Sequence, residues 1–78
     1  MADTRRYTSD MPDGRRMTFA DIQPGWWVQV YIGSWPYDTV CGYVTAVHYD
    51  GGVTADLDDL GSRRVPRSRL CSTLRPVA

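Results

Sequence analysis

Four arginines surround a single proline in the segment 63–70, which reads Arg-Arg-Val-Pro-Arg-Ser-Arg-Leu. A planar guanidinium group donates paired hydrogen bonds to phosphate or carboxylate, and it also stacks on nucleic-acid bases. The segment is therefore a candidate anion-binding edge. Its candidate binding residues are Arg63, Arg64, Arg67 and Arg69.

Charge pairing within a sheet is an alternative role for the first two arginines. We place Leu57 opposite Val65 on the core side of a hairpin. This register sets Asp58 opposite Arg64 on the outer side, where opposite charges contribute about 0.2–1 kcal/mol. An arginine paired in this way loses much of its attraction for phosphate. The two arginines after the proline have no obvious acid nearby in the sequence, so they are the stronger candidates.

Aromatic residues form the second candidate set. Trp27 and Tyr31 fall on the outer side of an expected strand, and Trp35 and Tyr37 lie in the loop that follows it. Exposed aromatic rings stack bases, line grooves for extended or proline-rich peptides, or mark subunit interfaces. In the alternative interpretation, the loop folds back over the domain, and Trp35 and Tyr37 cap a thin core.

The sequence contains no comparable pattern for catalysis or metal binding. Cys41 and Cys71 are far apart, and His48 has no second ligand at the spacing of a metal site. No Ser-His-Asp or Cys-His arrangement is implied either. We therefore expect no metal, no cofactor and no enzymatic activity. The two cysteines are interpreted either as small buried groups or as a disulfide.

Length and charge narrow the possible classes of protein. The 78 residues have room for one domain, and nine arginines balance nine aspartates while Lys, Glu and Asn are absent. Without Glu and Lys, long helices are not expected. A dedicated non-specific nucleic-acid binder carries a strongly positive net charge, which this chain lacks. Such a composition also suits a phage or plasmid accessory protein.

Targeting signals are not evident in the sequence. No apolar run approaches the roughly 20 residues that span a bilayer. Residues 1–16 lack the apolar region of a signal peptide. We therefore expect a soluble, cytoplasmic protein.

Alternation of apolar and polar residues predicts an all-β domain. Residues 1–16 have few apolar side chains and are expected to form a flexible arm. In the longest expected strand the apolar residues change sides near Thr45 and Ala46, which predicts a bulge or bend. The expected strands are 26–32, 39–49, 53–58, 63–65 and 71–74, with a hairpin turn at 50–52 and a 3₁₀ turn at 66–70.

Five short strands in this layout resemble an SH3-like small barrel, which would occupy residues 17–76. Val28-x-Val30-x-x-Gly33, followed by Gly42-x-Val44-x-x-Val47, is similar to the KOW-type motif of such barrels. The resemblance implies a relation to domains found in ribosomal proteins and transcription elongation factors. The segment 65–70 also resembles the proline-containing turn that precedes the last strand of signalling SH3 domains.

These observations predict a small non-enzymatic binding module. The first hypothesis is protein–protein interaction, with a partner or with a second copy, through the aromatic residues Trp27, Tyr31, Trp35 and Tyr37. The alternative is a KOW-like barrel that binds nucleic acid through Arg67, Arg69 and the Arg-containing arm, with Arg63 and Arg64 as secondary candidates. Neither hypothesis includes a membrane or a small-molecule cofactor.

Overall fold

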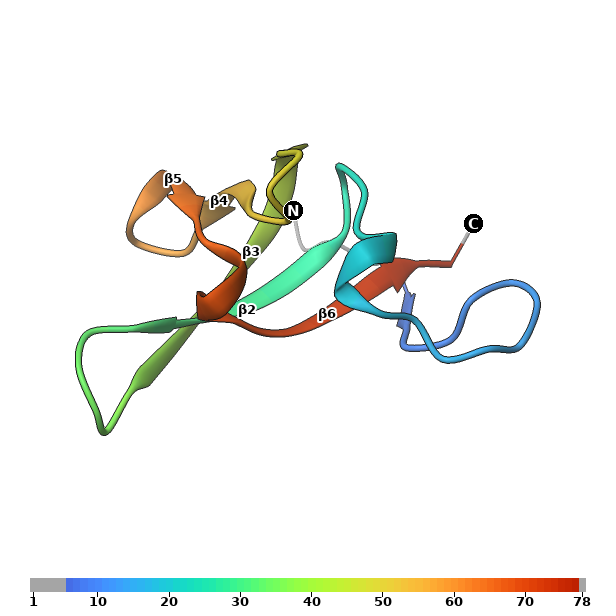
Figure 1. The fold of residues 1–78 in the computed structure, drawn as a ribbon, viewed down its shortest axis with the longest axis horizontal. Coiled ribbons are helices and arrows are strands. Elements are labelled where there is room, and N and C mark those ends of the chain that lie inside the picture. The colour runs from blue at the N-terminus through green and yellow to red at the C-terminus, as the bar shows by residue number, and fades with distance from the viewer. Residues whose placement is uncertain (1–5, 78) are drawn as a thin grey trace.

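The computed structural model describes residues 6–77 and consists of one antiparallel sheet with two short 3₁₀ helices (Figure 1). The strands lie in the order β1-β6-β2-β3-β4-β5. The all-β prediction is confirmed, as is a 3₁₀ turn before the last strand. The elements are β1 (Tyr7–Thr8), η1 (Phe19–Asp21), β2 (Trp27–Ile32), β3 (Asp38–Val47), β4 (Val53–Leu57), β5 (Gly61–Val65), η2 (Arg67–Arg69) and β6 (Leu70–Pro76).

The structure has six strands where the sequence predicted five. The additional strand, β1, lies within the segment expected to form an arm, of which residues 1–5 lie outside the described part of the chain. Tyr7 pairs with Pro76 and Thr8 with Arg75. A strand of two residues has no periodicity to detect. It forms because β6 continues to Pro76 and offers an edge to pair with.

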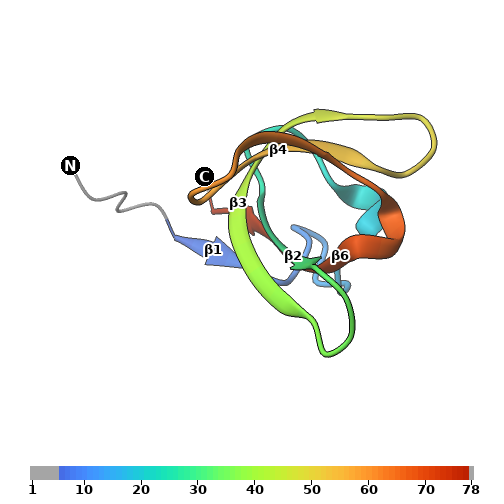
Figure 2. The ribbon, with the colours of Figure 1, turned by 90° about the vertical axis from the view of Figure 1, so that its left-hand side faces the viewer.

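The sheet curls around on itself (Figure 2). Most residues of the core that it encloses are alternating residues of the strands. Val28 and Val30 of β2 point inward and are almost completely buried. In β4, the predicted inward positions are likewise buried, while Asp56 is exposed. The buried cluster comprises Met17, Ile22, Trp26, Val28, Val30, Val44, Val53, Ala55, Leu57, Val65 and Leu70. No helix among residues 6–77 is long and apolar enough to cross a membrane.

The long strand β3 bends where the sequence predicted a bend. Its register against β4 shifts between Val44 and Ala46, so its first half pairs with β2 and its second half with β4. Gly42 of β3 lies in close contact with the main chain of β4. A Cβ atom at this position would collide with the Asp56 carbonyl and lie 2.8 Å from the Cα atom of Leu57. Only a residue without a side chain allows this approach.

The register predicted for the β4–β5 hairpin is wrong. Leu57 pairs with Gly61 instead of Val65, because residues 58–60 form a tight turn closed by a hydrogen bond from the Leu60 N–H to the Leu57 carbonyl. Arg64 therefore lies opposite Thr54 and not opposite Asp58. The longer loop assumed from the sequence is unnecessary because Asp59 adopts a positive φ angle of 64°.

A polar clasp, formed by Arg15, Thr18 and Asp21, holds the segment before η1 against η1 itself. Arg15 donates two hydrogen bonds to the carboxylate of Asp21, at 3.0 and 2.9 Å. The same carboxylate accepts hydrogen bonds from the backbone N–H and the hydroxyl of Thr18. The hydrogen bond from Arg15, followed by that from the Thr18 backbone, holds the pKa of Asp21 far below its ordinary range.

Gly42→Ala should destabilise the fold, because the added Cβ atom meets main-chain atoms that cannot rotate away. Overpacking of this kind costs about 1–3 kcal/mol, so the midpoint of urea unfolding should fall. Ser62→Ala, on the exposed strand β5, is the control and should change stability by less than about 0.5 kcal/mol. Equal midpoints for Gly42→Ala and the wild type would contradict the close approach of β3 and β4.

Asp21→Asn should lower the thermal midpoint, because it removes the charge that Arg15 and Thr18 bind. The depressed pKa sets the pH dependence of this effect. The stabilisation by ionised Asp21 is complete above its ordinary pKa of 3.8 and is lost as the pH falls through the lower folded-state value. The difference in midpoint between the two proteins should therefore be constant near neutrality and shrink only in strong acid. Asp13→Asn, which removes a longer contact to Arg15, is the control.

Candidate functional site

Three of the four predicted aromatic residues lie together at the loop that joins β2 and β3. The rings of Tyr31 and Tyr37 are 5.4 Å apart, and those of Trp35 and Tyr37 are 6.0 Å apart in an edge-to-face arrangement. Trp35 remains 83% exposed. The alternative in which Trp35 caps the core is therefore wrong. The loop extends outward from the sheet (Figure 1).

Arg69 of η2 connects this loop to the last strand. Its Nη1 atom donates a 2.9 Å hydrogen bond to the carbonyl of Gly33, and its guanidinium lies 5.1 Å from the centre of the Tyr37 ring. One contact fixes the start of the loop and the other fixes a ring within it. The open hollow between η2 and the loop is named here the aromatic groove, and it is lined by Tyr31, Trp35, Tyr37, Ser68 and Arg69.

Trp27, the fourth predicted aromatic residue, does not join the aromatic groove. It lies at the opposite end of β2, where it pairs with Tyr43 of β3 and is half-buried. The ring of Tyr43 lies 6.1 Å from that of Tyr7. Four residues along a strand separate Trp27 from Tyr31 by about 13 Å. Alternation along β2 places Trp27 and Tyr31 on the same face of the strand. The distance between them, however, keeps Trp27 out of the aromatic groove.

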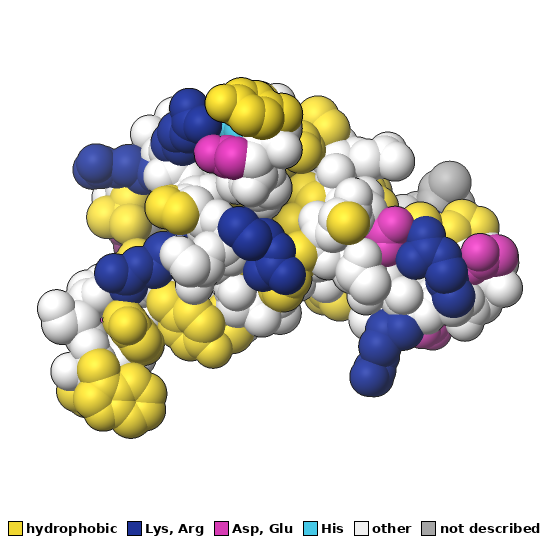
Figure 3. Space-filling view, in the orientation of Figure 1, with side chains coloured by type: hydrophobic (Ala, Val, Ile, Leu, Met, Phe, Trp, Pro, Cys, Tyr) yellow, Lys and Arg dark blue, Asp and Glu magenta, His cyan; other side chains and the backbone are white. Residues whose placement is uncertain are grey.

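Several arginine side chains gather on the part of the molecule that holds β5 and η2 (Figure 3). Arg64 pairs with the carboxylate of Asp50 at 3.4 Å. Arg67 lies over the ring of Phe19, 4.1 Å from its centre. Neither contact could be predicted from sequence spacing, because each joins two residues that lie far apart in the sequence.

The Arg63 side chain begins on the inner face of the β4–β5 hairpin, which the sequence did not indicate. Arg63 pairs across the sheet with Ala55, a completely buried residue. Its Nε atom donates a 3.2 Å hydrogen bond to the carbonyl of Leu60. The guanidinium is held at the end of the curled sheet and remains exposed to solvent there.

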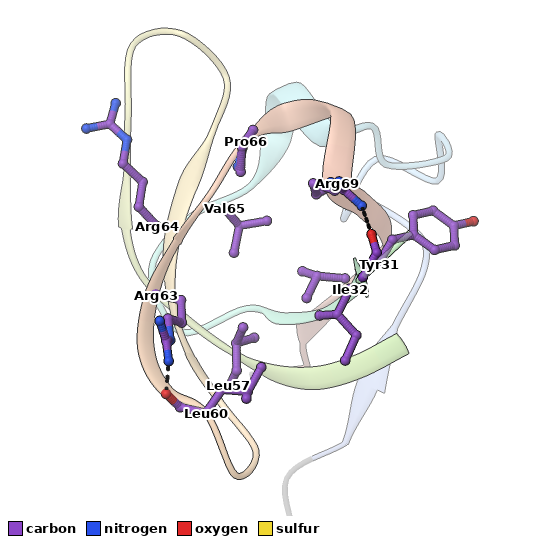
Figure 4. A pocket seen from close by; sticks show the side chains of 11 residues that line it. Tyr31, Ile32, Leu57, Leu60, Arg63, Arg64, Val65, Pro66 and Arg69 are labelled. Atoms are coloured by element: carbon purple, nitrogen blue, oxygen red, sulfur yellow. Dashed lines mark hydrogen bonds between the residues drawn. The ribbon is translucent and has the colours of Figure 1, made fainter. Parts of the chain in front are cut away.

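A pocket of about 270 Å³ opens at this end of the sheet, and it is named here the end pocket (Figure 4). Ile32, Leu57 and Val65 point into it, while Arg63 and Arg69 lie on opposite sides. The Arg64 side chain points away. The lining residues are Val30, Tyr31, Ile32, Gly33, Leu57, Leu60, Arg63, Arg64, Val65, Pro66 and Arg69. Its apolar members could not be recognised as site residues from the sequence, because their spacing is that of ordinary core positions.

The thiol, phenol and imidazole groups that could take part in chemistry are held by contacts with neighbouring side chains or by burial. Cys41 and Cys71 are free thiols, and burial raises the pKa of Cys41. The neighbouring Cys71 side chain raises the pKa of Tyr31, so the phenol beside the aromatic groove is neutral near pH 7. The Nε2 atom of His48 is 2.8 Å from the Thr54 hydroxyl. Within residues 6–77 no three His, Cys or acidic side chains are grouped to hold a metal ion.

Comparisons with known proteins give no match: no family model fits the chain, and neither a curated protein nor a solved structure matches it. The aromatic groove and the end pocket are therefore the features of this chain that bear on its function. Both sites share Tyr31 and Arg69 as lining residues.

Arg69→Ala should loosen the β2–β3 loop, because it removes both the hydrogen bond to Gly33 and the contact with Tyr37. An exposed cation–π contact alone contributes about 0.5–1 kcal/mol. We expect higher nanosecond mobility of residues 33–37 in ¹⁵N relaxation, with little change in the sheet. Arg67→Ala removes the same charge next to Phe19 and should leave this loop unaffected. If both variants mobilise the loop equally, Arg69 is not its specific anchor.

Proposed function

We propose that this chain is a non-enzymatic binding module that takes an extended segment of a partner protein in the aromatic groove. The observation that carries this proposal is a nearly fully exposed Trp35 on a loop that Arg69 anchors. Exposed tryptophan and tyrosine rings next to an arginine have the composition of binding hot spots. Anchoring the loop before binding reduces the conformational entropy that complex formation would otherwise cost.

An extended segment suits the shape and chemistry of the groove. The groove forms an open trough with an aromatic side, from the end of β2 and the projecting loop, and a polar side from η2. Aromatic troughs accept the apolar faces of extended or polyproline-type peptides. The phenol hydroxyl groups of Tyr31 and Tyr37 and the hydroxyl of Ser68 can bond to peptide carbonyls. These groups give polar contacts without requiring a charged ligand.

A protein partner is favoured over nucleic acid by how the arginines are used. Arg64 is neutralised by Asp50, and Arg67 lies over Phe19. The chain has no net charge, so it has no general attraction for a polyanion. The KOW-like resemblance supports the nucleic-acid alternative, and that alternative requires a continuous basic surface. The ion pair at Arg64 interrupts this surface at one of the four predicted positions.

The proposal predicts that peptides selected from a displayed random library will bind the wild type and lose affinity for Trp35→Ala. Hot-spot truncation costs about 2 kcal/mol or more, so the dissociation constant should rise by at least tenfold. Tyr49→Ala is the matched control, because Tyr49 is a fully exposed aromatic residue on the β3–β4 turn, outside the groove. Affinity can be measured by fluorescence anisotropy of labelled peptides.

Two other outcomes would reject this proposal. Binding of an oligonucleotide that weakens steeply between about 50 and 200 mM salt would support the nucleic-acid function instead. Selected peptides that bind Trp35→Ala and Tyr49→Ala equally well would remove the aromatic groove as the site. Self-association measured by sedimentation, if lost in Trp35→Ala, would identify a second copy as the partner.

A further inference from the structure

Two arginines at the end pocket are fixed in orientation without being neutralised. Arg63 is hydrogen-bonded to the carbonyl of Leu60, and Arg69 to the carbonyl of Gly33. Within residues 6–77, no carboxylate forms an ion pair with either guanidinium. A carbonyl uses one donor of the guanidinium and leaves its positive charge intact. The remaining donors of both groups are available to an anion.

The space between these two arginines is apolar. Ile32, Leu57 and Val65 point into the end pocket, and Leu60 and Pro66 complete its wall (Figure 4). Its volume of about 270 Å³ is below the roughly 300–1,000 Å³ of most small-molecule sites. A nucleotide or a large cofactor is therefore too big for it. One apolar side chain is a better match for the size and the lining.

We propose that the end pocket binds the C-terminal residue of a partner peptide. The apolar side chain of that residue packs against Ile32, Leu57 and Val65, while its terminal carboxylate accepts hydrogen bonds from Arg63 at one side of the pocket. This ligand follows from charge complementarity. The apolar lining requires an apolar side chain, the arginine requires an anion, and both groups must belong to the same residue of the ligand. A chain terminus supplies both within a few ångströms. Charge-assisted hydrogen bonds of this kind are roughly twice as strong as neutral ones.

The two sites are connected, so one peptide can occupy both. Tyr31 and Arg69 line the aromatic groove as well as the end pocket. An extended peptide that lies along Trp35 and Tyr37 can therefore direct its last residue past Arg69 into the pocket. The inference rests on the proposed function only for this upstream part of the peptide. Recognition of a terminal residue at the end pocket stands on its own contacts.

Arg63 could instead serve to prevent association between sheet edges, and a test of binding must distinguish this role from recognition of an anion. An inward-pointing charge on an edge strand discourages association of sheet edges, and β5 is an edge of this sheet. In that role the residue needs a charge but no partner anion. A structural Arg63 would affect aggregation, whereas a binding Arg63 affects the affinity for a carboxylate. The two interpretations therefore differ in what Arg63→Gln changes.

The test uses two small probes, N-acetyl-glycyl-leucine and its C-terminal amide, titrated into the ¹⁵N-labelled protein. The acid should shift the amide signals of Gly33, Leu57 and residues 61–65 in a saturable way. The amide probe should bind at least tenfold more weakly, because it lacks the charge that Arg63 binds. Equal binding of the two probes, or shifts only outside these residues, would overturn the proposal.

Matched variants locate the carboxylate. Arg63→Gln should weaken binding of the acid by about tenfold, equivalent to about 1.4 kcal/mol. Arg64→Gln removes the same charge one residue away, where the side chain points away from the pocket and pairs with Asp50. It should have little effect. Equal losses in both variants would indicate only a general attraction for anions and would overturn the assignment.

A third variant separates this inference from the proposed function. Trp35→Ala should not change the affinity for the acid probe, since the probe is too short to reach that side chain. Loss of library peptides without loss of the acid probe leaves the end pocket intact as a site. The reverse result, with library peptides that bind and an acid probe that does not, overturns the end pocket alone.

Discussion

The close approach of β3 to β4 at Gly42 is the constraint on which the rest of the structure depends. Because no side chain separates the two strands there, β3 can pair with β2 through its first half and with β4 through its second half. The bulge that follows turns the strand between its two partners. A single sheet then curls far enough to bury its own core. The end pocket exists because the same curl brings β5 towards the end of β2.

Strand positions followed from the sequence because alternation over five or more residues reports directly on burial. Val28 and Val30 of β2 are buried as their spacing predicts, and the bend near Ala46 is where the apolar residues change sides. The register of the β4–β5 hairpin could not be predicted from this alternation. Both possible registers place apolar residues on the inner face. The choice between them depends on whether Asp59 accepts a positive φ angle, which spacing does not reveal.

The candidate site was predictable in composition but not in grouping. Residue types alone identified the arginines and the aromatic side chains, because few other roles explain so many of them in a short chain. Their division between the aromatic groove and the end pocket, with Trp27 apart from both, depends on strand length and on contacts between segments far apart in the sequence. Arg69 shows this most clearly, since its partner Gly33 lies 36 positions away in the sequence. No local pattern encodes such a contact.

The chain has no net charge, but within the described part of it some arginines form ion pairs with aspartates and others do not. Among residues 6–77, the aspartates that pair with arginines are Asp13 and Asp21, which both contact Arg15, and Asp50 at the β3–β4 turn. The tight β4–β5 turn keeps Arg64 outside, next to Asp50, and directs Arg63 to the inner face, where its fixed partner is a carbonyl. A polyanion gains affinity from many positive charges in a row. In the complex proposed above, a single carboxylate on an apolar residue needs only the charge of Arg63 beside the apolar end pocket.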